Sequence, residues 1–206
     1  RVIVNFRGLD CVTFVENVFA LSRFVRSSEA TSLRNRPGAE ARYQELIEEI
    51  RYRDGQLDGY ASRLHYFSDW IADNARRMLI RDLGVDLEGI HDSEPVDFMT
   101  THVDAYRQLA DFGNLEALRE TERRLSTVGR VFLPETVIPA VADHIQDGDI
   151  IAAMSTVDGL DVAHTGLALW VDGTLRLMHA PLVGDSVQIS EVTLAERIQE
   201  IEGQDG

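Results

Sequence analysis

The stretch DVAHTGLALWVDGTLRLMHA, residues 161–180, decides the fold of the second half of this chain. Within it, two runs of mostly apolar and small residues flank the dipeptide Asp172-Gly173. Asp-Gly between two such runs is typical of the tight turn that joins two antiparallel strands. The stretch therefore predicts a β-hairpin in which Val171 pairs with Thr174.

Each strand of this hairpin carries one histidine, His164 and His179. Counting back from the turn places Gly166 opposite His179, with His164 on the same face and diagonal to it. Neighbouring strands lie roughly 5 Å apart, so the two imidazoles can meet. A slip of one residue would reverse which face each side chain occupies. The alternative is that each histidine is a buried core residue with satisfied hydrogen bonds.

Cys11 is the only cysteine of the 206 residues and lies in the segment GLDCVTFVE, residues 8–16. The segment predicts a helix over residues 11–25, because apolar side chains recur there at helical spacing, namely Phe14, Val15, Val18, Leu21 and Val25. A thiol in the first turn of a helix faces unpaired N–H groups and the positive end of the helix dipole, which favour the thiolate. We interpret Cys11 as a nucleophile with a histidine in reach. The alternative is a small buried apolar residue.

Helical patterns fill the first half of the chain and strand-like patterns fill the second half. We expect helices over residues 11–25, 39–53, 67–79, 98–109 and 115–125 and from about 192, a polar loop over 27–38, and an irregular segment over 82–95. Strands are expected over residues 2–6, 130–133, 149–155, 163–171, 174–179 and 186–189. This order predicts an α+β fold in a single domain, residues 1–206, with a helical insertion over approximately 39–127. The chain begins as if in mid-strand, so we expect a trimmed N-terminus.

Composition and charge exclude several classes of protein. The net charge is −15 and all 20 basic residues are arginine, which argues against nucleic-acid binding because an acidic surface repels phosphates. No run approaches 18 apolar residues, so no membrane span is expected. The six histidines show no His-x-x-x-His or His-Glu-x-x-His spacing, which argues against a catalytic metal. One free thiol fits a reducing compartment or a bacterial envelope enzyme.

The order of these motifs resembles the N-acetylmuramoyl-L-alanine amidase-like family within the NlpC-type cell-wall cysteine peptidases, which are papain-like enzymes. The matching segments cover nearly the whole chain and are residues 4–17, 50–55, 59–71, 98–102 and 148–152 and the two histidine strands. The resemblance implies a nucleophile helix packed on an antiparallel sheet, and no cofactor. It assigns Cys11 as the nucleophile, His164 as the base and His179 as the group that orients the base. The spacing between the two histidines is longer than in many relatives, so His179 is the least secure of the three.

Substrate contacts are expected around the catalytic residues and on the insertion. A cation, an imidazole and a phenol lie close together on what we expect to be a loop that enters a helix, and would suit an anionic, sugar-bearing peptide; the residues are Ser62, Arg63, His65 and Tyr66. The alternative is an interface between the insertion and the core. Asp10 either pairs with an arginine or caps the helix. Thr165, next to His164, is the remaining candidate.

The resemblance implies a metal-independent cysteine amidase that hydrolyses the bond between N-acetylmuramic acid and L-alanine in peptidoglycan or anhydro-muropeptides. Three alternatives are a γ-D-glutamyl-diamino-acid endopeptidase, a domain that binds muropeptides without cutting them, and a transglutaminase-like or acyltransferase variant that uses the same Cys–His pair with an amine acceptor. We expect a location in the bacterial cell envelope or periplasm, with cytoplasmic recycling as the alternative. The oligomeric state is left open.

Overall fold

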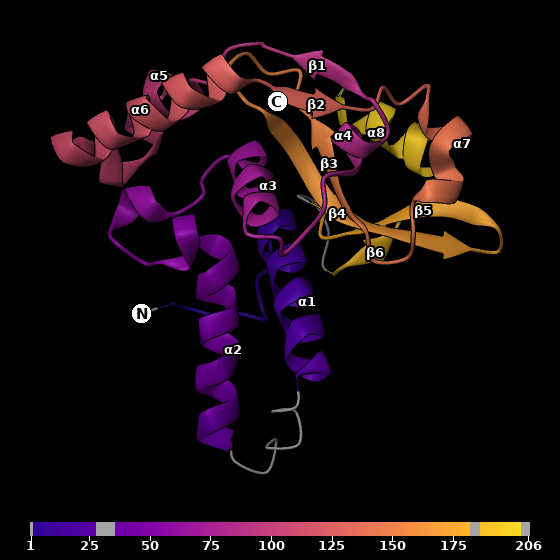
Figure 1. Ribbon diagram of the computed structural model, residues 1–206, viewed down its shortest axis with the longest axis horizontal. Coiled ribbons are helices and arrows are strands. Elements are labelled where there is room, and N and C mark those ends of the chain that lie inside the picture. Colours follow the sequence, from indigo (N-terminus) through magenta and orange to yellow (C-terminus); the bar gives the residue numbers. More distant parts are fainter. Residues whose placement is uncertain (1, 28–35, 182–185, 203–206) are drawn as a thin grey trace.

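The computed structural model describes residues 2–27, 36–181 and 186–202. Its larger sheet is antiparallel and has the strand order β3-β4-β5-β6 (Figure 1). The bounds are β3 (Ile150–Met154), β4 (Val162–Val171), β5 (Thr174–His179) and β6 (Gln188–Ile189). Helices precede this sheet in the chain, so the predicted α+β class is confirmed.

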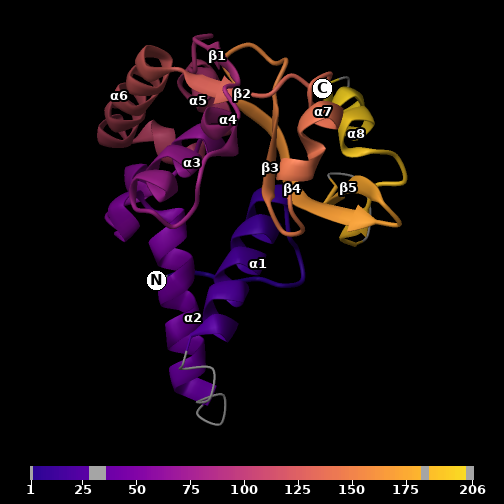
Figure 2. The ribbon, with the colours of Figure 1, turned by 45° about the vertical axis from the view of Figure 1, so that its right-hand side comes forward.

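Two long helices, α1 (Cys11–Arg26) and α2 (Arg36–Arg51), run side by side below the sheet (Figures 1 and 2). Helix α1 also packs against β4, and its buried Phe14 and Val15 share one apolar cluster with Leu167 of β4 and Ala180. Helix α3 (Phe67–Arg76) adds Phe67 and Trp70 to the same cluster. The first part of the predicted stripe, Phe14 and Val15, therefore fixes α1 on one face of the sheet. Its last two members, Leu21 and Val25, are exposed, so that part of the prediction was wrong.

The opposite face of the sheet carries a second apolar cluster. Side chains alternate along a strand, so Ala168 and Leu177 point away from the face that holds Leu167. They pack with Leu194 and Ile201 of α8 (Leu194–Glu202), and α7 (Ile138–Val141) closes the same side. The sheet is thus covered on both faces.

The segment predicted to be a helical insertion contains a third apolar cluster, which includes Leu118 and Leu125 of α6 (Phe112–Val128). Between α2 and α6 lie the short elements η2 (Arg53–Gly55), η3 (Tyr60–Ser62), α4 (Leu83–Asp86), α5 (Phe98–Thr101), η4 (Val103–Ala105) and η5 (Arg107–Ala110). Strand β1 (Ile90–Asp92) pairs with β2 (Arg130–Phe132), and η6 (Ala142–His144) follows α7.

Several boundary predictions were wrong. Residues 2–5 have no regular structure, so the first predicted strand does not form. The helix expected over 98–109 is broken into α5, η4 and η5, with non-helical backbone angles at His102 (φ −120°, ψ 42°) and Tyr106 (φ −121°, ψ 93°). The segment 82–95 contains α4 and β1. Helix α2 begins at Arg36, with Pro37 in its first turn, where proline is tolerated. Residues 28–35 of the predicted polar loop lie outside the described residues.

Candidate active site

The hairpin positions the two histidines as predicted. Val171 pairs with Thr174, and the register continues to Leu167 opposite Met178. The turn residues Asp172 and Gly173 have φ of 50° and 75°, a left-handed pair that favours Asp-Gly. The Nε2 atom of His164 lies 2.7 Å from Nδ1 of His179, and the ring planes are nearly perpendicular at 88°.

Gly166 allows the two strands to pack this closely. A Cβ atom at this position would lie 2.7 Å from both the Leu177 Cδ1 and the Met178 carbonyl oxygen. Both distances are shorter than a normal contact, and the carbonyl belongs to the paired strand. The glycine two residues after His164 is therefore a packing requirement of the hairpin that carries both imidazoles.

The surroundings of the two rings favour their neutral forms. Burial lowers the pKa of His164 to about 4, and the charges of His179 and Arg197 act in the same direction. Burial also lowers the pKa of His179, again with a contribution from Arg197 of α8. Two neutral imidazoles can share one proton in a hydrogen bond. Because His164 uses Nε2 for this bond, its Nδ1 remains for another partner.

Cys11 is the first residue of α1, and the helix start is well defined. Asp10 is the N-cap: its carboxylate accepts a hydrogen bond from the Thr13 N–H at 2.7 Å, while the Asp10 N–H donates to the Thr13 hydroxyl at 2.9 Å. This capping box satisfies two backbone donors. Asp10 thus caps the helix, and it forms no ion pair with an arginine in the part of the chain that the structure describes.

The first turn of α1 leaves backbone donors open next to the thiol. Within the described ranges, the N–H groups of Cys11 and Val12 donate to no protein acceptor. A helix N-terminus with free N–H groups attracts negative charge. The same positive end favours a thiolate and would stabilise an oxyanion formed at the Cys11 position.

The thiol and the imidazoles are carried by elements that pack together, since α1 contacts β4 and β5. The Cys11 side chain is partly buried and is a free cysteine. Among the residues described, its sulfur makes no hydrogen bond to either imidazole. The two imidazoles lie at one end of the strand pair, since His164 is near the start of β4 and His179 is the last residue of β5.

The remaining predicted contacts divide into buried and accessible residues. Tyr66 is buried, and its hydroxyl donates to Glu122 at 2.7 Å and accepts from the Met99 N–H. Thr165 is 1% exposed, and within the described part of the chain its hydroxyl has no hydrogen-bond partner. Ser62 bonds to its own turn, through the Gly59 carbonyl and the Asp58 N–H. The burial of Tyr66 favours the alternative of an internal interface for this residue.

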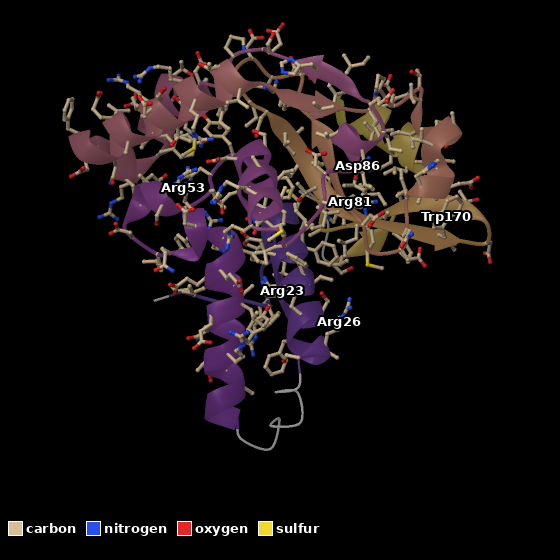
Figure 3. The ribbon with its side chains drawn as sticks, in the orientation of Figure 1. Arg23, Arg26, Arg53, Arg81, Asp86 and Trp170 are labelled. Carbon is tan, nitrogen blue, oxygen red and sulfur yellow. The ribbon has the colours of Figure 1, made fainter. Side chains whose placement is uncertain are left out.

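Arg63 and His65 are only partly buried. His65 stacks on Tyr60 with ring centroids 4.4 Å apart, and its Nε2 lies 3.0 Å from the Tyr60 carbonyl oxygen. Burial lowers the pKa of His65 to about 4. The segment is anchored by ion pairs to a buried carboxylate, which the sequence did not reveal: Asp69 of α3 is held by Arg53 and by Arg124 of α6 (Figure 3 shows Arg53 near α3).

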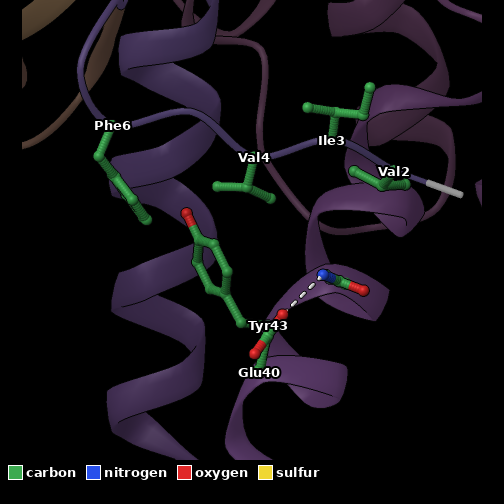
Figure 4. Close-up of a pocket in the computed structure, with 7 residues that line it drawn as sticks. Val2, Ile3, Val4, Phe6, Glu40 and Tyr43 are labelled. Atoms are coloured by element: carbon green, nitrogen blue, oxygen red, sulfur yellow. Dashed lines mark hydrogen bonds between the residues drawn. The ribbon is translucent and has the colours of Figure 1, made fainter.

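Two cavities lie away from these residues. One of about 450 Å³ lies between the N-terminal segment and α2 (Figure 4), where Phe6 stacks on Tyr43. The other, of about 410 Å³, lies against the loop 155–160 that precedes β4. Neither is lined by Cys11, His164 or His179. In the described ranges, no group of three His, Cys, Asp or Glu residues is arranged to hold a metal ion, and no helix is long and apolar enough to cross a membrane.

A family model described as N-acetylmuramoyl-L-alanine amidase-like matches residues 1–204. The chain belongs to this family. A solved structure of an N-acetylmuramoyl-L-alanine amidase from Bacteroides uniformis is 32% identical, with a TM-score of 0.85, and the match covers 97% of this chain and 81% of that one. A structure described as a putative xylanase from Bacteroides fragilis is 31% identical, with a TM-score of 0.86 and coverage of 97% and 85%.

The structure of protein LPG0564 from Legionella pneumophila is more distant, with 21% identity and a TM-score of 0.58. The match covers 95% of this amidase-like chain and 72% of the other chain. At that identity the likeness shows the fold alone. No curated protein matches the amidase-like chain.

Proposed function

We propose that this amidase-like chain hydrolyses the amide bond between N-acetylmuramic acid and L-alanine in peptidoglycan or in anhydro-muropeptides. The observation that carries the proposal is the hydrogen-bonded pair of His164 and His179 on the sheet against which the Cys11 helix packs. The identity of the cleaved bond is inferred from the description of the family and from the name of the Bacteroides uniformis neighbour.

The proposed reaction is acyl transfer through a thioester. His164 accepts the thiol proton of Cys11 and the sulfur attacks the lactyl carbonyl carbon, which gives a tetrahedral oxyanion. His164 then donates the proton to the L-alanine nitrogen as the C–N bond breaks, so the peptide leaves with a free amine. Water, deprotonated by His164, hydrolyses the thioester and restores the thiol. The lowered pKa of His164 supports a neutral base before attack.

His179 has a positioning role in this scheme. Its bond to Nε2 of His164 fixes the base ring and leaves Nδ1 for the thiol. The oxyanion would receive hydrogen bonds from the open N–H groups at the start of α1. No step uses a metal or a cofactor. A nucleophile helix on an antiparallel sheet, followed by two histidine strands, is also what supports placing this chain with the NlpC-type, papain-like enzymes.

The test compares the wild-type protein with Cys11→Ala on two substrates, purified anhydro-muropeptides and intact sacculi, and identifies products by mass spectrometry. The expected result is free sugar and free peptide beginning with L-alanine, from the wild type alone and with EDTA present. A circular dichroism melt of the variant verifies that it folds.

Three other outcomes would contradict the proposal. A sugar–dipeptide product would show an endopeptidase. Activity in Cys11→Ala, or its loss in EDTA, would refute the cysteine mechanism. Binding of muropeptides without any product would indicate a binding domain. In this proposal the protein acts on bacterial cell-wall material in the envelope, or on fragments of that material during recycling.

A further inference from the structure

Arg63 is partly buried and, unlike most arginines that the structure describes in this acidic chain, its side chain is not paired with a carboxylate. Most of the arginines with described side chains reach a carboxylate, for example Arg51 on Glu16, Arg53 on Asp69 and Arg130 on Asp92. Over the described residues, the guanidinium of Arg63 forms neither a hydrogen bond nor an ion pair, although the net charge is −15. A partly desolvated cation without a fixed partner has capacity to bind an external anion.

The backbone places Arg63 close to the nucleophile helix. The next residue, Leu64, donates its N–H to the Arg51 carbonyl at 3.0 Å, and Arg63 itself forms a β-bridge with Tyr52. The Arg51 side chain in turn bonds to the buried carboxylate of Glu16, in the second turn of α1. Burial raises the pKa of Glu16, and the positive charges of Arg51 and Arg63 oppose that rise, as expected if both lie near α1.

The residues beside Arg63 form a rigid and uncharged wall. His65 stacks on Tyr60, and the bond from its Nε2 to the Tyr60 carbonyl oxygen fixes the ring. The low pKa of His65 keeps this ring neutral at pH 7. The segment carrying Arg63 also cannot shift freely, because Leu64 is buried in the cluster that contains Phe14 and Val15 of α1. A fixed arginine beside a flat aromatic surface suits a planar group such as a carboxylate.

We propose that Arg63 binds a carboxylate of the peptide that follows the scissile amide, and so selects substrates with an acidic residue after the first amino acid. This inference rests on the proposed function. The lactyl carboxyl of the sugar is consumed in the scissile amide, so the anion must come from the peptide side. A guanidinium can hold it through two parallel N–H···O bonds.

The test measures binding, separately from hydrolysis, with the inactive variant Cys11→Ala as the background. Isothermal titration uses L-alanyl-D-glutamine, whose only carboxylate is the α-carboxylate, and L-alanyl-D-glutaminamide, in which that carboxylate is converted to the carboxamide. We expect the carboxylate peptide to bind at least tenfold more tightly. Adding Arg63→Gln should abolish that preference by weakening only the carboxylate peptide, and Arg63→Lys should restore part of it.

Arg107→Gln is the matched control, because Arg107 is an exposed arginine of the same insertion. It should leave both affinities unchanged. Equal weakening of both peptides by Arg63→Gln with an unchanged melting temperature, or no weakening of either, would overturn the proposal. A binding preference that depends on Arg63 in a protein that hydrolyses nothing would uphold this inference and refute the proposed amidase activity.

Discussion

The Nε2 atom of His164 lies 2.7 Å from the Nδ1 atom of His179, and one hairpin carries both rings. His164 is at the start of β4, where the strand is also paired with Ala153 of β3, and His179 is the last residue of β5. The bond therefore depends on a register that starts at the Asp172-Gly173 turn. Any change that shifts this register separates the rings, because a one-residue slip turns the side chains to the other face.

Replacing each histidine in turn should distinguish the general base from the residue that positions it. We expect His164→Ala to lower kcat/KM by about 1,000-fold or more, since it removes the general base, and His179→Ala to lower it by roughly 10- to 100-fold. Steady-state hydrolysis of anhydro-muropeptides is the measurement. His144→Ala is the control, because that ring is exposed and distant in sequence from the hairpin. A larger loss for His179→Ala than for His164→Ala would reverse the two roles.

The hairpin should not tolerate a side chain at residue 166. Gly166→Ala places a methyl group 2.7 Å from the Met178 carbonyl oxygen, so the strands must move apart. We expect the free energy of unfolding to fall by about 1–3 kcal/mol and the activity to fall with it. Urea denaturation measures the first effect.

Gly113→Ala is the control for that substitution, since Gly113 lies in the first turn of α6 and an added methyl would meet only the Asp111 side chain. It should keep wild-type stability or gain a little. Equal urea midpoints for Gly166→Ala and the wild type would show that the close approach of β4 and β5 is not required.

The ion-pair network at Asp69 should hold α6 and the segment after α2 against α3. Asp69 is 1% exposed and accepts hydrogen bonds from Arg53 at 3.1 and 2.7 Å and from Arg124 at 2.7 Å. Asp69→Ala leaves two guanidinium groups beside an apolar site, and we expect a loss of about 2–4 kcal/mol in the free energy of unfolding.

The exposed pair Glu116–Arg119 provides the comparison for Asp69, and Glu116→Ala should cost less than about 1 kcal/mol. Urea denaturation of both variants at pH 7.5 is the measurement. Similar losses for the two substitutions would mean that burial of Asp69 contributes nothing beyond a surface ion pair.

The free energy of unfolding should decrease as the pH is lowered, over a range set by the pKa of His65. The pKa of His65 is about 4 in the folded chain and 6.5 as its ordinary value, so the unfolded chain binds the extra proton first as pH falls. The stabilising contribution is complete above pH 6.5 and is lost as the pH falls toward 4. His65→Gln should therefore lose less stability than the wild type between pH 7.5 and pH 5, measured by urea denaturation.

His144→Gln, with its exposed ring, should show the wild-type dependence on pH. The hypothesis fails if His65→Gln loses as much stability over this interval as the wild type does.

Local patterns predicted those parts of the site that depend on neighbours in sequence. The Asp-Gly turn fixed the hairpin register, and the alternation of strand side chains then placed both histidines on one face. The start of α1 followed from Asp10 and the apolar spacing after Cys11, and the structure begins the helix at that residue. Both are short-range effects, because a turn and a helix cap involve residues fewer than five positions apart.

Patterns could not predict the contacts of the insertion. Tyr66 looks like an accessible phenol in the sequence, but Glu122, 56 residues later, binds its hydroxyl inside the core of the insertion. The same Glu122 also accepts the Thr100 N–H of α5, a contact between segments 22 residues apart. The pairing of β1 with β2 joins segments about 40 residues apart and likewise has no local signal.

The sequence by itself therefore determined the α+β order of elements, the helix that begins at Cys11 and the hairpin that joins His164 to His179. These depend on backbone preferences and side-chain periodicity, which act over a few residues. Only the tertiary structure decided which polar side chains are buried, which ion pairs form, and that Arg63 reaches no carboxylate among the residues that the structure describes. Burial and ion pairing depend on segments far apart in the chain, so they are fixed only when the helices and the sheet pack together.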